Sequence, residues 1–138
     1  MVGRRHPRLG ANAIEFAMTL PVYILLLAWV VDGSWLVYQS SVVEGAAQYG
    51  CRAGAIIDPG QDDISLQNVL DTAEDVMLEE VAALGGACHA CSATASVGGT
   101  PPERILVCKA RNGYDPLFGL LNPTTLEGSA MRRLEWQR

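Results

Sequence analysis

The sequence lacks the residue sets on which most enzymes depend. Only two histidines, His6 and His89, occur in 138 residues, and there is no Ser/His/Asp set, no glycine-rich phosphate loop and no cluster of metal-ligating residues. Catalysis requires such convergent groups. We therefore expect a protein that is not an enzyme and that needs no cofactor.

Charge is missing from one segment and is unevenly spread over the rest. No Asp, Glu, Lys or Arg occurs from Phe16 to Val31, whereas three arginines and no acid precede Gly10. Of the ten Lys and Arg in the chain, seven follow Gly10 against fifteen Asp and Glu, which gives this part a net charge of −8. An acidic body repels a phosphate backbone, so nucleic acid is excluded as a partner. The three arginines are Arg4, Arg5 and Arg8.

The uncharged segment predicts a helix that crosses a membrane. A span needs about twenty residues, and the stretch from Ala13 to Val31 provides nineteen, with one acid inside it. No small-x-small cleavage site follows Val31, which argues against a secretory signal peptide removed at that point. The arginines before the span are expected to stay in the cytoplasm. The acidic part is then expected in the periplasm or outside the cell.

The one acid in this stretch, Glu15, lies where a carboxylate is costly unless it finds a partner or reaches the water interface. Its surroundings, Gly10 followed by Ala-Asn-Ala-Ile-Glu15-Phe16, resemble the processing region of type IV pilin-like proteins. In such proteins a peptidase cuts after the glycine, and the glutamate pairs with the new N-terminal ammonium of a neighbouring subunit. The resemblance implies cleavage between Gly10 and Ala11 and a counter-ion role for Glu15, with Phe16 as the other matched position. A carboxylate that simply faces water is the alternative.

We expect the helix to continue beyond the span, from Ala11 to Ile57, because Asp58-Pro59-Gly60 is a strong stop. Pro21 lies inside this range and should kink or locally loosen the helix. Small residues in it suit close packing against another helix or against the protein's own head, and the sequence favours neither partner. The small residues in question are Gly33, Gly45, Gly50 and Gly54.

The remainder predicts an α+β head. Apolar residues from Leu66 to Leu84 recur at helical spacing, and Gly85-Gly86 ends the pattern. The acids along this helix are interpreted as a solvated face and not as a calcium site, because no EF-hand pattern is present. These acids are Asp71, Glu74, Asp75 and Glu79.

Strand signals follow the second helix. Alternation from Ala87 to Val97, a turn at Gly98–Pro102 and the segment Arg104–Lys109 predict a hairpin. An apolar loop over Tyr114–Leu121 and a last strand over Thr125–Trp136 complete a small antiparallel sheet. The chain thus divides into a basic leader (1–10), a membrane-spanning and stem helix (11–58) and a periplasmic head (61–138).

The four cysteines, Cys51, Cys88, Cys91 and Cys108, follow a membrane-directed segment. An even number in a small exported domain indicates two disulfides. Cys88-x-x-Cys91 alone does not make a structural zinc site, which needs a second ligand pair at close spacing. A turn centred near Gly99 would place Cys91 opposite Cys108, and Cys88 could then reach Cys51 on the stem. We therefore predict Cys91–Cys108 and Cys51–Cys88, one of three possible pairings.

Two segments together resemble the TadE-like minor pilins (pseudopilins) of bacterial tight-adherence (Tad/Flp) type IV pilus systems. They are Gly10–Pro21, with its Glu-Phe and nearby proline, and the tail Gly128-Ser-Ala-Met-Arg-Arg-Leu-Glu135. The resemblance implies processing by a prepilin peptidase, a single pass through the inner membrane and a head in the periplasm. It also implies a role in priming, capping or decorating the pilus, with a place in the pilus or at its tip. The implied partners are the major pilin, a companion minor pilin and the inner-membrane assembly platform.

Two other functions remain open. A type II secretion pseudopilin shares the leader and Glu15, although Pro21 and the tail favour the tight-adherence kind. A single-pass membrane protein with an extracytoplasmic interaction head would keep its N-terminus intact.

Overall fold

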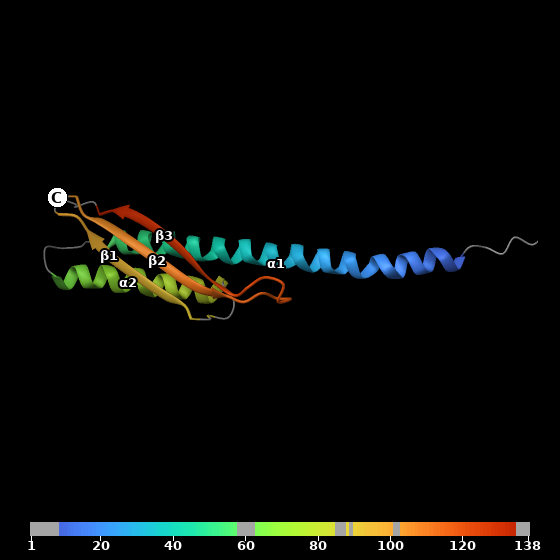
Figure 1. The fold of residues 1–138 in the computed structure, drawn as a ribbon. Coiled ribbons are helices and arrows are strands. Elements are labelled where there is room, and N and C mark those ends of the chain that lie inside the picture. The colour runs from blue at the N-terminus through green and yellow to red at the C-terminus, as the bar shows by residue number, and fades with distance from the viewer. Residues whose placement is uncertain (1–8, 58–62, 85–87, 89, 101–102, 135–138) are drawn as a thin grey trace, which may run out of the picture.

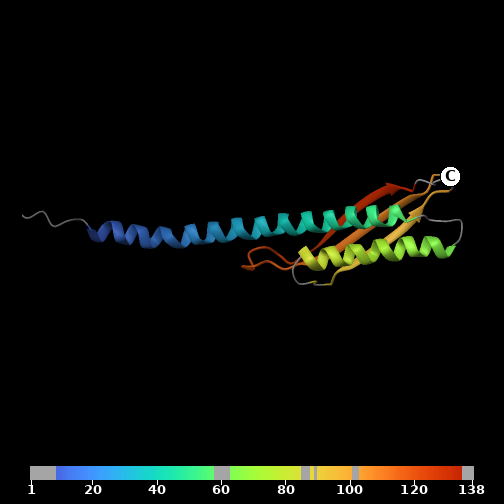
Figure 2. The same cartoon turned by 180° about the vertical axis from the view of Figure 1, so that it is seen from behind.

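A computed structural model describes residues 9–57, 63–84, 88, 90–100 and 103–134. It contains a long helix, a second helix and a three-stranded antiparallel sheet, so the predicted α+β fold is confirmed. The second helix and the sheet lie along the C-terminal half of the long helix, and the N-terminal half projects from them as a bare rod (Figures 1 and 2). The elements are α1 (Leu9–Ile56), α2 (Asp63–Leu84), β1 (Ser92–Gly98), β2 (Ile105–Tyr114) and β3 (Thr124–Arg133).

Helix α1 is continuous over 48 residues, including Pro21. Proline has no N–H to donate and removes one hydrogen bond from the helix, but it does not end the helix here. Two residues before Pro21, the Thr19 hydroxyl donates to the carbonyl oxygens of Glu15 and Phe16, both at 3.1 Å. The predicted stop at Asp58–Gly60 lies outside the described residues, and α1 ends immediately before it.

The core forms between the C-terminal half of α1, α2 and one face of the sheet. Helix α1 packs on β2 and β3, and α2 packs on β1 and β2, so the two helices lie side by side on that face. Every fourth residue of α2 points inward, as its apolar spacing predicts. The buried side chains include Val43, Ala46 and Ala47 of α1, Val69, Ala73, Met77 and Val81 of α2, and Leu106, Cys108 and Ala110 of β2.

Two of the four stem glycines pack against the protein's own head. A Cβ atom at Gly50 would meet the Met77 side chain and lie 2.7 Å from the carbonyl oxygen of Ala73, and one at Gly54 would lie 3.0 Å from the Ala73 Cβ. The absence of a Cβ atom at these two positions therefore lets α2 approach α1 closely. A Cβ at Gly33 or Gly45 would meet no atom within 4 Å. The choice left open by the sequence is thus settled for Gly50 and Gly54 only.

The predicted disulfide pairing is wrong, and the position of the hairpin turn explains why. The β1–β2 hairpin closes at Gly98 and Ile105, two residues further along than a turn centred near Gly99, and this shifts the register by four residues. Ala95 therefore lies opposite Cys108, while the Cys91 sulfur lies 3.3 Å from the Asn112 side-chain oxygen.

The pairs that form are Cys51–Cys108 and Cys88–Cys91, with Cα–Cα distances of 5.6 and 5.4 Å. The first bond joins α1 to the central strand of the sheet, and both of its cysteines are buried in the core. The disulfide therefore links the stem covalently, near the C-terminal end of α1, to the central strand of the sheet.

The interpretation of the α2 acids as a solvated face needs one correction. The Glu74 carboxylate accepts a hydrogen bond of 2.8 Å from the backbone N–H of Ala95 in β1. β1 is an edge strand, and an unpaired edge N–H invites pairing with another chain. Glu74 thus protects the edge of β1 and ties α2 to it.

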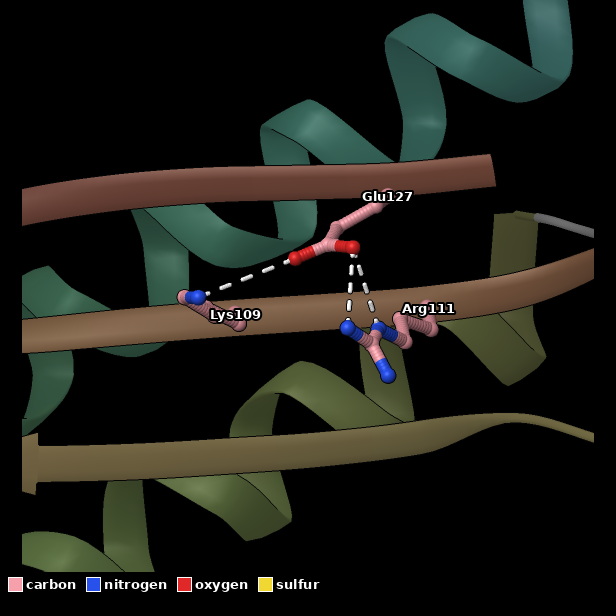
Figure 3. A network of polar contacts seen from close by, with 3 residues as sticks. All are labelled: Lys109, Arg111 and Glu127. Carbon is pink, nitrogen blue, oxygen red and sulfur yellow. Dashed lines mark hydrogen bonds and ion pairs between the residues drawn. The ribbon is translucent and has the colours of Figure 1, made fainter. Parts of the chain in front are cut away.

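The solvent face of the sheet carries a small ionic network (Figure 3). Arg111 lies directly opposite Glu127 in the β2–β3 register and donates Nε–H and Nη2–H to its carboxylate at 3.2 and 3.0 Å. The ammonium group of Lys109 lies 3.9 Å from the other carboxylate oxygen. All three side chains are about half exposed, so each pair contributes less than about 1 kcal/mol.

Candidate functional site

The N-terminal half of α1 is an apolar surface that the described part of the head leaves uncovered. Its most hydrophobic window has a mean hydropathy of 2.1 and no buried residue, and the helix is long and apolar enough to cross a membrane. A core helix of a soluble protein would bury these side chains, which this one does not. The exposed large apolar residues include Ile14, Phe16, Met18, Leu20, Val22, Tyr23, Ile24, Leu25, Leu26, Leu27, Trp29, Val30 and Val31.

Glu15 lies on this bare half of α1, with an exposed side chain. Among the described residues no cationic group is paired with its carboxylate. The backbone of Gly10 and Ala11 is already helical, and Ala11 precedes Glu15 by four positions. Residues four apart lie on the same face of a helix, one turn from each other, so Glu15 shares a face with the position that would become the N-terminus after cleavage.

A second carboxylate, Asp32, marks the point where the bare half of α1 meets the head. It is fully buried, and each of its carboxylate oxygens accepts one backbone N–H, from Phe118 at 3.0 Å and from Leu120 at 3.2 Å. Its carbonyl oxygen accepts a hydrogen bond of 3.1 Å from the Tyr114 hydroxyl. A buried carboxylate is tolerated when its oxygens are hydrogen-bonded in this way. Asp32 therefore fastens the loop between β2 and β3 to the stem.

These surroundings shift the pKa of the Tyr114 hydroxyl. Burial raises the pKa of Tyr114 above its ordinary value of 10.0, and the negative charges of Asp32 and Asp115 add to the rise. The phenol is therefore neutral throughout the physiological range and keeps its proton for the hydrogen bond to Asp32.

Neither Asp32 nor Tyr114 was identified as a functional residue from the sequence. The available signal was that Asp32 is the first charged residue after the span. Its partners lie more than 80 residues away along the chain, which no local pattern reveals.

The loop that Asp32 holds, residues 115–123, carries apolar side chains on its surface. Leu117, Phe118 and Leu120 are 58%, 59% and 40% exposed, and Gly119 between them has a φ of +69°. The loop lies beside α1 at the end of the sheet that faces the bare rod, as both ribbon views show (Figures 1 and 2).

Among the described residues, one long apolar helix with an uncovered half continues into a small disulfide-linked α+β head, an arrangement that fits a membrane-anchored, pilin-like class of protein. Residues 10–52 match the model of the TadE-like protein family. The resemblance inferred from Gly10–Pro21 is thereby confirmed over the span and most of the stem, whereas the sheet and α2 lie outside the match. Neither the curated proteins nor the solved structures that were compared include a match to the chain. The TadE-like segment points to a protein associated with a tight-adherence pilus.

Proposed function

We propose that the protein is a minor-pilin-like subunit of a tight-adherence pilus, cleaved after Gly10 and assembled with other pilin-type subunits through the bare half of α1. The observation that carries the proposal is that the exposed apolar surface and the TadE-like match fall on the same residues. An exposed apolar surface that extends over the bare half of α1 requires an apolar environment. The lipid of the inner membrane provides it before assembly, and the helices of other subunits provide it afterwards.

The span fits the membrane in length and orientation. Residues 13–31 form about 28 Å of helix at about 1.5 Å per residue, close to the roughly 30 Å thickness of the hydrocarbon core. The basic leader would lie on the cytoplasmic side, and Asp32 would mark the periplasmic boundary. The head, which begins to pack on α1 just beyond Asp32, would then lie in the periplasm.

Glu15 has a chemical role in this arrangement. Cleavage after Gly10 by the prepilin peptidase creates an ammonium at Ala11, inside or beside the hydrocarbon core of the membrane. A carboxylate and an ammonium that are partly withdrawn from water stabilise each other, and each is destabilising when left alone. Pairing Glu15 with the ammonium of a neighbouring subunit would set the axial register between the two α1 helices.

Crosslinking tests the assembly role of this surface. A photoreactive residue at Val22, on the bare half of α1, should crosslink in cells to another pilin-type subunit. Glu15→Ala should leave the protein in the membrane but reduce this crosslink severalfold. The matched control is Glu44→Ala, which removes an exposed carboxylate from the head half of the same helix and should leave the crosslink unchanged.

Two outcomes would contradict the proposal. If Val22 formed crosslinks only to lipid or to unrelated membrane proteins, the chain would be an ordinary single-pass anchor. If Glu15→Ala and Glu44→Ala behaved alike, the counter-ion role of Glu15 would be wrong.

A further inference from the structure

We propose that the loop between β2 and β3 is a second membrane contact, in which Leu117, Phe118 and Leu120 enter the periplasmic leaflet beside the α1 span. The inference rests on α1 crossing the membrane as proposed above. It assigns the membrane surface, and no second protein, as the partner of this loop.

The first argument is position. The backbone nitrogen of Phe118 lies 3.0 Å from the Asp32 carboxylate, so the loop is fixed at the level of Asp32 along the helix axis. Asp32 follows Val31, the last residue of the uncharged segment, by a single position, and consecutive helical residues rise by about 1.5 Å. A loop held at this height meets the lipid interface as soon as α1 spans the bilayer.

The second argument is composition. Leu117 and Phe118 are more than half exposed, and no charged residue occurs from Pro116 to Leu126. Leu117, Phe118 and Leu120 thus place three exposed large apolar side chains within four residues of the chain, and exposed apolar side chains gathered in this way often mark a binding or membrane contact. In the periplasmic leaflet the same side chains would be removed from water.

The third argument comes from the aromatic residues of α1 near Asp32. Trp29 lies just before it, with a side chain 61% exposed. Trp35 and Tyr38 lie just after it and stack with ring centroids 5.5 Å apart. Tryptophan and tyrosine concentrate at membrane–water interfaces because their rings are amphipathic. Trp29 and Trp35, on either side of Asp32 in the sequence, support an interface at the level of the loop, whereas the Tyr38 hydroxyl donates to the carbonyl oxygen of Leu84 in α2.

The fourth argument concerns the backbone. A loop that enters lipid must satisfy its N–H groups internally, because the hydrocarbon offers no acceptor. The turn at Gly119 leaves the N–H groups of Phe118 and Leu120 without sheet partners, and the Asp32 carboxylate accepts both. Asp32 therefore satisfies two of the loop's backbone N–H groups at the level where the loop would meet the interface.

Site-directed spin labelling tests the inference in the full chain reconstituted in vesicles of phosphatidylethanolamine and phosphatidylglycerol. A label incorporated as an unnatural amino acid at position 117 should collide more with oxygen, which concentrates in lipid, than with a water-soluble nickel complex. The ratio of the two collision rates should match that at position 27 in the span. It should exceed severalfold the ratio at position 129, an exposed position on the solvent face of β3.

The outcomes separate the loop from the span. If position 27 reported lipid and position 117 reported water, the loop inference alone would be wrong. If position 117 were shielded from both reagents, a protein and not lipid would cover the loop, and the inference would also be overturned. If position 27 itself reported water, the proposed function would fail with it.

Asp32 variants provide the second measurement. Asp32→Ala removes both acceptors and should lower the collision ratio at position 117 toward that at position 129, with position 27 unchanged. Asp32→Asn keeps one oxygen acceptor and should give an intermediate ratio. An unchanged ratio in Asp32→Ala would contradict the anchoring role of Asp32. The comparison of positions 27, 117 and 129 in the wild-type background decides the membrane contact even if Asp32→Ala does not fold.

Discussion

Breaking the Cys51–Cys108 disulfide should destabilise the head far more than breaking Cys88–Cys91. Cys51 belongs to α1 and Cys108 to the central strand β2, and both side chains are buried in the core. Their bond closes a loop across a sequence separation of 57 residues, whereas Cys88 and Cys91 are separated by 3. The perturbation is the double variant Cys51→Ala with Cys108→Ala. The matched control is Cys88→Ala with Cys91→Ala.

The expected magnitude follows from loop size. A disulfide that restricts the unfolded chain contributes about 4 kcal/mol for a loop of the first size and about 2 kcal/mol for the second. Replacing the buried sulfur atoms by hydrogen leaves a small void in the core, which adds about 1 kcal/mol of lost packing to the first variant. The free energy of unfolding should therefore be about 3 kcal/mol lower in the Cys51/Cys108 variant than in the control variant.

Urea unfolding of the full chain in detergent micelles, followed by near-ultraviolet circular dichroism, measures this difference. Equal losses in the two variants would refute the reasoning, and so would a larger loss in the control. The pairing itself is checked by Cys51→Ala alone, which should leave Cys108 as the cysteine that reacts with a thiol reagent after unfolding. A reactive Cys88 would instead indicate the Cys51–Cys88 pairing.

Three further changes test the packing of the head. Gly50→Ala should lower the free energy of unfolding by about 1–3 kcal/mol, because the new Cβ would lie 2.7 Å from a backbone oxygen of α2. Gly45→Ala, which has open space around it, should raise the free energy of unfolding by up to about 1 kcal/mol through helix propensity. Equal effects of the two variants in urea unfolding would contradict the packing role assigned to Gly50. Glu74→Ala should accelerate hydrogen exchange at the Ala95 amide and lower the free energy of unfolding by about 1 kcal/mol. Glu74→Gln keeps an acceptor and should change the exchange rate less. An unaltered rate in the alanine variant would show that the edge of β1 does not depend on this carboxylate. Because the folded state raises the pKa of Tyr114, the contribution of the neutral phenol to stability is fully present below pH 10.0 and is lost as the pH rises above that value. The free energy of unfolding, measured at increasing alkaline pH, should show this loss in the wild type and not in Tyr114→Phe. Identical alkaline profiles of the two proteins would contradict the raised pKa.

The features that were correctly predicted depend on patterns within one element. The absence of charge from Phe16 to Val31 predicts an apolar helix whatever the rest of the chain does. The spacing of Val69, Ala73, Met77 and Val81 predicts which face of α2 is buried, and the tail predicts β3 within a few residues. Each of these depends on a period or on composition, which the local sequence specifies.

The features that were missed depend on contacts between distant residues. The disulfide pairing required the exact residue at which the hairpin turns, because a displacement of two residues in the turn moves the register by four. The role of Asp32 required the position of a loop more than 80 residues away. Glu74 has the same sequence character as the solvated acids around it, and only the packing of α2 on β1 distinguishes it. Local chemistry does not encode such long-range placement.

The mass of the protein isolated from native membranes tests the central proposal most directly. The chain should begin at Ala11 in cells that contain the prepilin peptidase, and it should retain the leader through Gly10 when the peptidase is absent. A chain that still begins at Met1 or Val2 in the presence of the peptidase would contradict the assignment as a processed pilin-like subunit and would leave a single-pass membrane anchor.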